Sequence, residues 1–180
     1  WKYGFIIFLI CFLNTPALAK SWPDINKTTR IVYAHGPKKS TNIYTIKPNG
    51  NDKRQITDTD AKDWEPTWSP DGSQIVFSSW EEKEGGHLYK VNVSGRGKPV
   101  KLTQNPALYL DPEWSYTQNR IVFNRGANQV YKDAIDPFGS LMMEDIAWIS
   151  AEGGKVTVID KAKGRSTPHF SKVSDRIYLN

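Results

Sequence analysis

Residues 65–77 read EPTWSPDGSQIVF, and this stretch decides the fold class because it joins two short apolar segments through a tight turn. Asp71-Gly72 follows Ser69-Pro70 at the centre. Glycine tolerates the positive φ that closes such a turn, while β-branched and aromatic residues on either side favour strands. The stretch therefore predicts a β-hairpin.

The same pattern occurs twice more in the chain. Residues 111–123 (DPEWSYTQNRIVF) and 167–179 (TPHFSKVSDRIYL) align with it without gaps, and RIVYA at 30–34 is a partial copy. All three full copies have proline at the second position and serine at the fifth. The fourth position is aromatic in each copy: Trp68, Trp114 and Phe170. The chain therefore contains an internal repeat.

The spacing of the copies indicates the architecture. From Ile31 to Ile75 is 44 residues, from Ile75 to Ile121 is 46, and from Ile121 to Ile177 is 56. A period in the forties with about four short strands per unit is the signature of a β-propeller blade. We therefore expect an all-β fold: a β-propeller of four-stranded antiparallel blades, with about three and a half blades present and the ring incomplete.

The expected organisation has three parts: a leader (1–19), a short linker (20–29) and a partial propeller (30–180). The blades are expected at 30–63, 64–109, 110–165 and 166–180. In the second blade the strands are expected around 65–68, 74–78, 87–93 and 99–103. Because the chain begins at Trp1 and ends inside an apparent strand, we expect a fragment of a longer reading frame.

The first 19 residues have the pattern of a secretory signal peptide. Lys2 is basic, an apolar run of about 10 residues follows, and Ala17-Leu18-Ala19 supplies small residues for cleavage. The run is shorter than the roughly 20 residues of a spanning helix. We expect cleavage after Ala19, no transmembrane span afterwards, and a periplasmic or secreted protein; the alternative is a retained N-terminal anchor.

Composition excludes several classes of protein. With 38% hydrophobic and 24% charged residues, the chain is neither intrinsically disordered nor a multi-span membrane protein. The net charge of +5 comes from interspersed residues rather than a basic helix or groove, so we expect no nucleic-acid partner.

No catalytic motif is present, so no catalytic residue is assigned. The three histidines (His35, His87 and His169) form no zinc-binding pair, and no Gly-x-Ser-x-Gly sequence occurs. Trp68, Trp114 and Phe170 are expected to fill the space between blades rather than to stack on a cofactor. No cofactor is expected in this segment.

Two loops contain candidate residues for a metal site and for an interaction site. Asp58, Asp60 and Asp63, with Glu65 beside them, are candidate Ca²⁺ ligands, although a solvated polar loop explains them too. Residues 124–144 form a 21-residue excursion where other blades have about seven residues, and such insertions often map to a binding face. Its apolar residues form the candidate interaction loop: Tyr131, Phe138, Leu141, Met142 and Met143. A surface loop without a partner is the alternative.

The segments NIYTIKPNG (42–50), RQIT (54–57) and EPTWSPDGSQIVF (65–77) together resemble the TolB-like (WD40-like, PD40) propeller repeat. The resemblance covers residues 30–180. It departs from the pattern in the later copies, where the Pro-Asp-Gly turn becomes Tyr-Thr-Gln at 116–118 and Lys-Val-Ser at 172–174. Members are exported bacterial proteins, including periplasmic TolB, and the repeats also form the non-catalytic N-terminal part of secreted hydrolases.

The resemblance implies two functions. The first is a non-catalytic binding or gating scaffold at the N-terminus of a secreted amidohydrolase-like hydrolase, or of a prolyl-oligopeptidase-like peptidase, with the catalytic domain downstream as its partner. The alternative is a TolB-type periplasmic propeller that binds a protein partner and has no enzymatic activity. TolB proteins place an α/β domain before the propeller, and only about ten residues separate Ala19 from Arg30, which favours the first function.

Overall fold

The computed structural model describes residues 29–37, 40–94, 98–127, 143–162 and 167–179. All regular secondary structure in this part of the chain is β-strand. Within it, no helix is long and apolar enough to cross a membrane. The expected all-β fold class is confirmed.

The strands form four antiparallel sheets in which the strand order follows the chain order. We call these sheets blades 1 to 4. Blade 1 contains β1 (Ile31–His35), β2 (Asn42–Ile46) and β3 (Arg54–Gln55). Blade 2 contains β4 (Lys62–Trp68), β5 (Gln74–Glu81), β6 (Gly85–Asn92) and β7 (Val100–Lys101). Blade 3 contains β8 (Leu108–Trp114), β9 (Arg120–Gly126), β10 (Met143–Ser150) and β11 (Thr157–Lys161). Blade 4 contains β12 (His169–Phe170) and β13 (Ile177–Tyr178).

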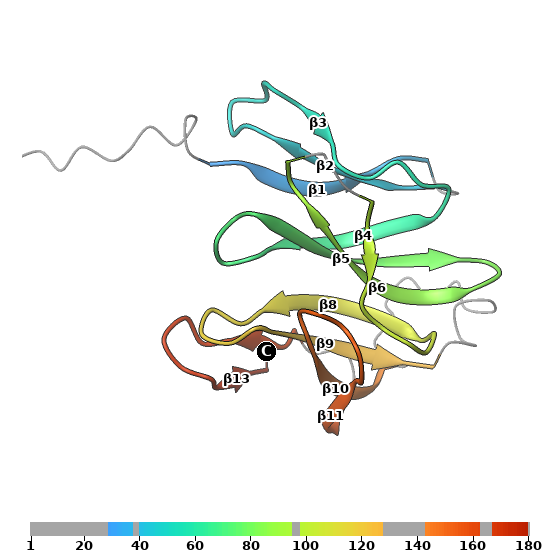
Figure 1. Ribbon diagram of the computed structural model, residues 1–180, viewed down its shortest axis with the longest axis vertical. Coiled ribbons are helices and arrows are strands. Elements are labelled where there is room, and N and C mark those ends of the chain that lie inside the picture. Colours follow the sequence, from blue (N-terminus) through green and yellow to red (C-terminus); the bar gives the residue numbers. More distant parts are fainter. Residues whose placement is uncertain (1–28, 38–39, 95–97, 128–142, 163–166, 180) are drawn as a thin grey trace, which may run out of the picture.

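The blades follow one another in space as they do in the chain (Figure 1). The first strands are neighbours across blades, since β4 contacts β8 and β8 contacts β12. Over the described residues the blades do not close into a ring. The structure is thus a partial β-propeller, as expected from the repeat period.

Blade 2 uses the alternation of its strands to pack against both neighbours. Ile75 and Phe77 of β5 pack with Ile43 of blade 1, whereas Val76 of the same strand packs with blade 3. Because successive strand residues point to opposite faces, a run of apolar residues such as Ile-Val-Phe supplies both interfaces. Phe77 is almost fully buried, and burying such a side chain contributes roughly 1.5–3 kcal/mol.

The first strands of blades 2 and 3 each contain a bulge, and β4 is longer than expected. β4 begins at Lys62, and its pairing with β5 shifts between Trp64 and Thr67. Glu65 at this shift has a φ of 48°, and the equivalent Asp111 of β8 has a φ of 52°. Both residues precede a proline, which cannot donate a ladder hydrogen bond and is tolerated at bulges. The repeated acid-Pro pair therefore marks a bulge rather than the start of a strand.

A repeated threonine closes the outer side of blades 1 and 2. The backbone N–H of Ile43 donates to Thr57 Oγ1 at 2.9 Å, and that of Leu88 donates to Thr103 Oγ1 at 3.2 Å. The last strands of these blades, β3 and β7, are only two residues long, so the threonine hydroxyl satisfies a buried donor just beyond the ladder. This explains why the RQIT and VKLT segments end in the same residue.

Candidate interaction face

A row of polar residues on the first strands connects one blade to the next. The backbone N–H of Asp111 donates to Glu65 Oε2 at 2.6 Å, and Thr67 Oγ1 donates to Glu113 Oε2 at 3.3 Å. Each bond joins equivalent positions of blades 2 and 3. Burial raises the pKa of Glu113, and the hydrogen bond from Thr67 and the nearby His169 partly oppose this shift. These carboxylates are therefore used to hold blades together.

The repeated aromatic residues lie in the cores between blades. Trp68 packs against the cluster shared by blades 1 and 2, and Trp114 belongs to the cluster shared by blades 2 and 3. Phe170 packs with Val122 and Ile146 between blades 3 and 4. The structure thus places Trp68, Trp114 and Phe170 where inter-blade filling requires them, although Trp68 is only half-buried.

The structure does not bring the candidate calcium ligands together. Asp63 is fully buried and accepts hydrogen bonds from Ser79 Oγ at 2.6 Å and Thr59 Oγ1 at 3.0 Å. Asp58 instead accepts a bond from the Gln55 side chain at 3.3 Å. Among the described residues, no three Asp, Glu, His or Cys side chains are grouped so that they could hold a metal ion. Asp63 therefore serves the packing of blade 2, while Asp60 joins no such ligand group.

The candidate interaction loop lies mostly outside the described residues. This applies to Tyr131, Phe138, Leu141 and Met142. Met143 is described, and it differs from the expectation: it is the first residue of β10 and is buried against Leu108 and Leu110. Because its side chain fills a core, Met143 belongs to the sheet rather than to an exposed loop.

The tight turns of all four blades gather on one side of the stack (Figure 1). We call this side the turn face and define it by the turns at 47–53, 69–73, 115–119 and 171–176. Side chains near these turns connect three of the blades: Lys90 of β6 pairs with Glu152 of blade 3 at 3.2 Å, and Thr117 donates to Asp175 of blade 4. The blades that form the turn face are therefore held to one another by side-chain contacts from blade 2 to blade 4.

The turn at 69–73 is held rigid by Asp71. Its carboxylate accepts hydrogen bonds from Ser69 Oγ at 2.6 Å and Ser73 Oγ at 2.7 Å, and from the Ser73 backbone N–H. These bonds lower the pKa of Asp71 to about 2. The residue thus stays ionised at physiological pH, and its charge is directed into its own turn.

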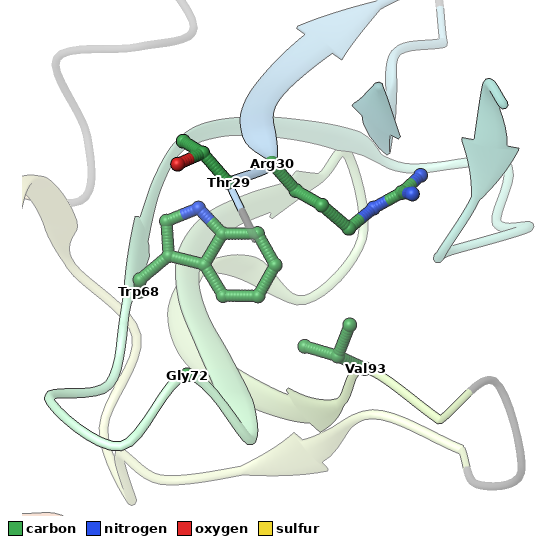
Figure 2. A pocket seen from close by; sticks show the side chains of 5 residues that line it. All are labelled: Thr29, Arg30, Trp68, Gly72 and Val93. Atoms are coloured by element: carbon green, nitrogen blue, oxygen red, sulfur yellow. The ribbon is translucent and has the colours of Figure 1, made fainter. Parts of the chain in front are cut away.

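Two grooves open on the turn face, one on each side of this turn. The first lies between blades 1 and 2, has a volume of about 340 Å³, and is lined by Thr29, Arg30, Trp68, Gly72 and Val93 (Figure 2). The second lies between blades 2 and 3, has a volume of about 330 Å³, and includes Asp71, Trp114 and Tyr116 in its lining. The first groove is mainly apolar, whereas polar and apolar surface line the second in similar measure.

A charged cluster borders the first groove. Asp52 pairs with Arg30 at 2.7 Å and Arg54 at 2.8 Å, and Lys47 lies 3.9 Å from it. Hydrogen bonds from Arg54 and then Arg30 lower the pKa of Asp52 to about 2. The cluster has three cations and one carboxylate, so it carries excess positive charge.

Sequence reasoning missed this cluster and the groove beside it. Arg30 and Asp52 are 22 residues apart, and Trp68 ends β4 whereas Val93 follows β6. One sequence signal could have indicated the cluster. Arg30 is a charged residue at the start of the partial repeat, just before apolar residues that pack against the core.

Comparison with known proteins identifies the family. Residues 16–147 match the model of the TolB beta propeller domain (PD40). Since the match covers most of the chain, the protein belongs to this family.

Relatives and solved structures agree with this assignment. A Tol-Pal system protein TolB of Nitratidesulfovibrio vulgaris is 35% identical over 57 residues, covering 32% of this chain and 13% of that protein. A dipeptidyl-peptidase 5 of Porphyromonas gingivalis is 34% identical over 77 residues, covering 42% of this chain and 9% of that protein. The structure of a putative TolB from Agrobacterium tumefaciens superposes with a TM-score of 0.63 at 20% identity, covering 78% of this chain and 48% of that one. The chain therefore corresponds to only part of the length of each.

Proposed function

We propose that this chain is a non-catalytic, protein-binding β-propeller of the TolB type that acts in the periplasm. The turn face carries the proposal, because it gathers the turns of four blades on one side of the molecule, with a groove at each of two blade junctions. Matched regions of TolB proteins support the same assignment. Binding rather than chemistry also suits a surface whose described carboxylates are engaged in turns and blade contacts.

Site-specific cross-linking in the native host tests this function. A photo-reactive residue replaces Tyr116, which is 46% exposed on the turn face. The matched control replaces Glu82, which is exposed in the turn between β5 and β6 at the opposite end of blade 2. We expect one discrete cross-linked envelope protein from the Tyr116 position and none from the Glu82 position. Equal cross-linking from both positions, or none from either, would contradict the proposal.

The periplasmic location depends on residues 1–19, which lie outside the described part of the chain. N-terminal sequencing of the mature protein tests it directly. We expect the mature protein to start at Lys20, after cleavage behind Ala19. A mature chain that retains the leader would instead favour the membrane anchor.

A second candidate function is supported by the dipeptidyl-peptidase 5 relative, in which the matching region is a small part of a larger protein. In this candidate the propeller is the non-catalytic part of a secreted peptidase. Release of nitroaniline from dipeptidyl nitroanilides by the purified native polypeptide would favour it over the binding protein. The expected link to an amidohydrolase stays a prediction, which the same preparation can test with metal-dependent amide hydrolysis.

A further inference from the structure

The groove between blades 1 and 2 exposes more of its tryptophan than the equivalent groove between blades 2 and 3 does. Trp68 is half-buried, whereas its repeat equivalent Trp114 is 5% exposed. Figure 2 shows the Trp68 ring, the stem of Arg30 and the Val93 side chain around one space. A Cβ added to Gly72 would meet no atom within 4 Å, so this side of the groove is open as well.

The size of the groove limits what it can hold. Its volume of about 340 Å³ is at the low end of the roughly 300–1,000 Å³ usual for ligand pockets. Such a space accepts one large apolar side chain rather than a folded element. A flat aromatic wall surrounded by polar groups is also the usual setting for an anchor residue in a protein interface.

The charge around the groove indicates which residues flank that side chain in the partner. Arg30, Lys47 and Arg54 stand against Asp52 alone, and the Arg54 and Lys47 side chains are 57% and 38% exposed. The carboxylate of Asp71, in the turn that contains Gly72, is already bound by Ser69 and Ser73. Complementary charge on a partner is therefore negative.

We propose that this groove binds a single large apolar side chain from an acidic segment of a partner protein. The proposal rests on the protein-binding function above and names the chemistry of the partner. The apolar side chain fills the space between Trp68 and Val93, and acidic residues beside it face Arg54 and Lys47.

Fluorescence anisotropy with labelled synthetic peptides tests the proposal on the full native polypeptide. The probe is Asp-Glu-Trp-Glu-Asp, and the comparison peptides are Asp-Glu-Ser-Glu-Asp and Lys-Arg-Trp-Arg-Lys. We expect the probe to bind saturably and both comparison peptides to bind at least tenfold more weakly. We also expect added salt to lower the affinity for the probe. If the basic peptide binds as tightly as the probe, the partner segment need not be acidic and the proposal is wrong. If the serine peptide binds as tightly, the groove does not bind an apolar side chain and the proposal is wrong as well.

Two variants connect binding to the groove. Val93→Asp and Arg54→Glu are each expected to weaken the probe about tenfold or more. Val173→Asp is the matched control, because Val173 is 88% exposed in the blade 4 turn of the same face, and it is expected to leave binding unchanged. Arg54 is exposed, so Arg54→Glu remains informative if Val93→Asp lowers the melting temperature.

Two further outcomes are decisive. If a peptide of residues 20–28 (KSWPDINKT) binds more tightly than the acidic probe, the groove serves the chain's own segment and the proposal is wrong. If Val93→Asp and Arg54→Glu leave the cross-linked partner from position 116 intact and the probe does not bind, the proposed function stands and this inference fails. Absence of any cross-linked protein from position 116 in the chain without these two substitutions would instead contradict the proposed function itself.

Discussion

Two aspartates of blade 2 show how environment sets opposite properties for one residue type. Asp71 lies in an exposed turn and accepts three hydrogen bonds, which lower its pKa to about 2. Asp63 is fully buried, and this burial raises its pKa despite hydrogen bonds from Ser79, Thr57 and Thr59. The two residues therefore affect stability in opposite pH ranges.

Asp71→Asn is expected to destabilise the protein most near neutral pH. Because the folded pKa of about 2 lies below the usual aspartate pKa of 3.8, ionised Asp71 stabilises the fold above pH 3.8. This contribution disappears as pH falls from about 4 to about 2, so the melting temperatures of wild type and variant should converge there. Thermal unfolding followed by circular dichroism across this range checks it, and a gap that widens on acidification would contradict it.

Asp63→Asn is expected to show the reverse dependence. A raised folded pKa means that ionisation opposes folding: the stability linked to protonated Asp63 is complete below pH 3.8 and is lost as pH rises through the folded pKa. Relative to wild type, the variant should therefore gain stability between pH 3.5 and pH 7. Urea unfolding at several pH values measures this difference, and a relative loss at pH 7 would show that the carboxylate is needed in its ionised form.

At the scale of elements, glycine has two different roles in blade 2. Gly72 has a φ of 70° in the β4–β5 turn, with open space around it. Gly86 lies in β6, and a Cβ there would be 2.1 Å from the carbonyl oxygen of Ala107. The first glycine serves a turn conformation and the second allows β6 to approach the segment that leads into β8.

Gly86→Ala is expected to destabilise the protein by about 1–3 kcal/mol, because the added methyl group must push the backbone at Ala107 away. Gly72→Asn is the matched control and should cost less than about 1 kcal/mol, since asparagine tolerates the left-handed conformation. Denaturant unfolding of both variants gives the comparison. A smaller loss for Gly86→Ala than for Gly72→Asn would contradict the close approach.

At the scale of the whole molecule, blade 1 presents a face that the other blades bury. Ile31 and Tyr33 are equivalent to Ile75 and Phe77 of blade 2, which pack against blade 1. Ile31 is 49% exposed, and Tyr33 stacks with Tyr44 at 5.9 Å between ring centroids. An apolar sheet face of this kind requires cover to remain soluble.

A polypeptide limited to residues 20–180 is therefore expected to self-associate. Ile31→Lys should reduce this association without disturbing the fold, because Ile31 already lies half in solvent. Sedimentation velocity measures the change, and Val173→Lys at the blade 4 turn serves as the control. A monomeric, cooperatively unfolding wild-type product of this length would show that the blade 1 face needs no cover.

The sequence by itself determined the propeller, because the period of the repeat and the alternation within each strand are local properties. The Asp71-Gly72 turn, the apolar runs and the positions of Trp68, Trp114 and Phe170 are all readable without knowing how blades are oriented. The bulge at Glu65 was not recognised, since a positive φ before proline has no unique residue pattern.

Only the tertiary structure determined which residues meet at the surface of the molecule and which are buried. The cluster of Arg30 around Asp52, the groove between Trp68 and Val93, and the burial of Met143 depend on the angle between neighbouring blades. That angle follows from many weak contacts between residues far apart in the chain, so it cannot be predicted from a local sequence pattern. The repeat therefore specifies a blade, and the packing of one blade on the next specifies what the turn face can bind.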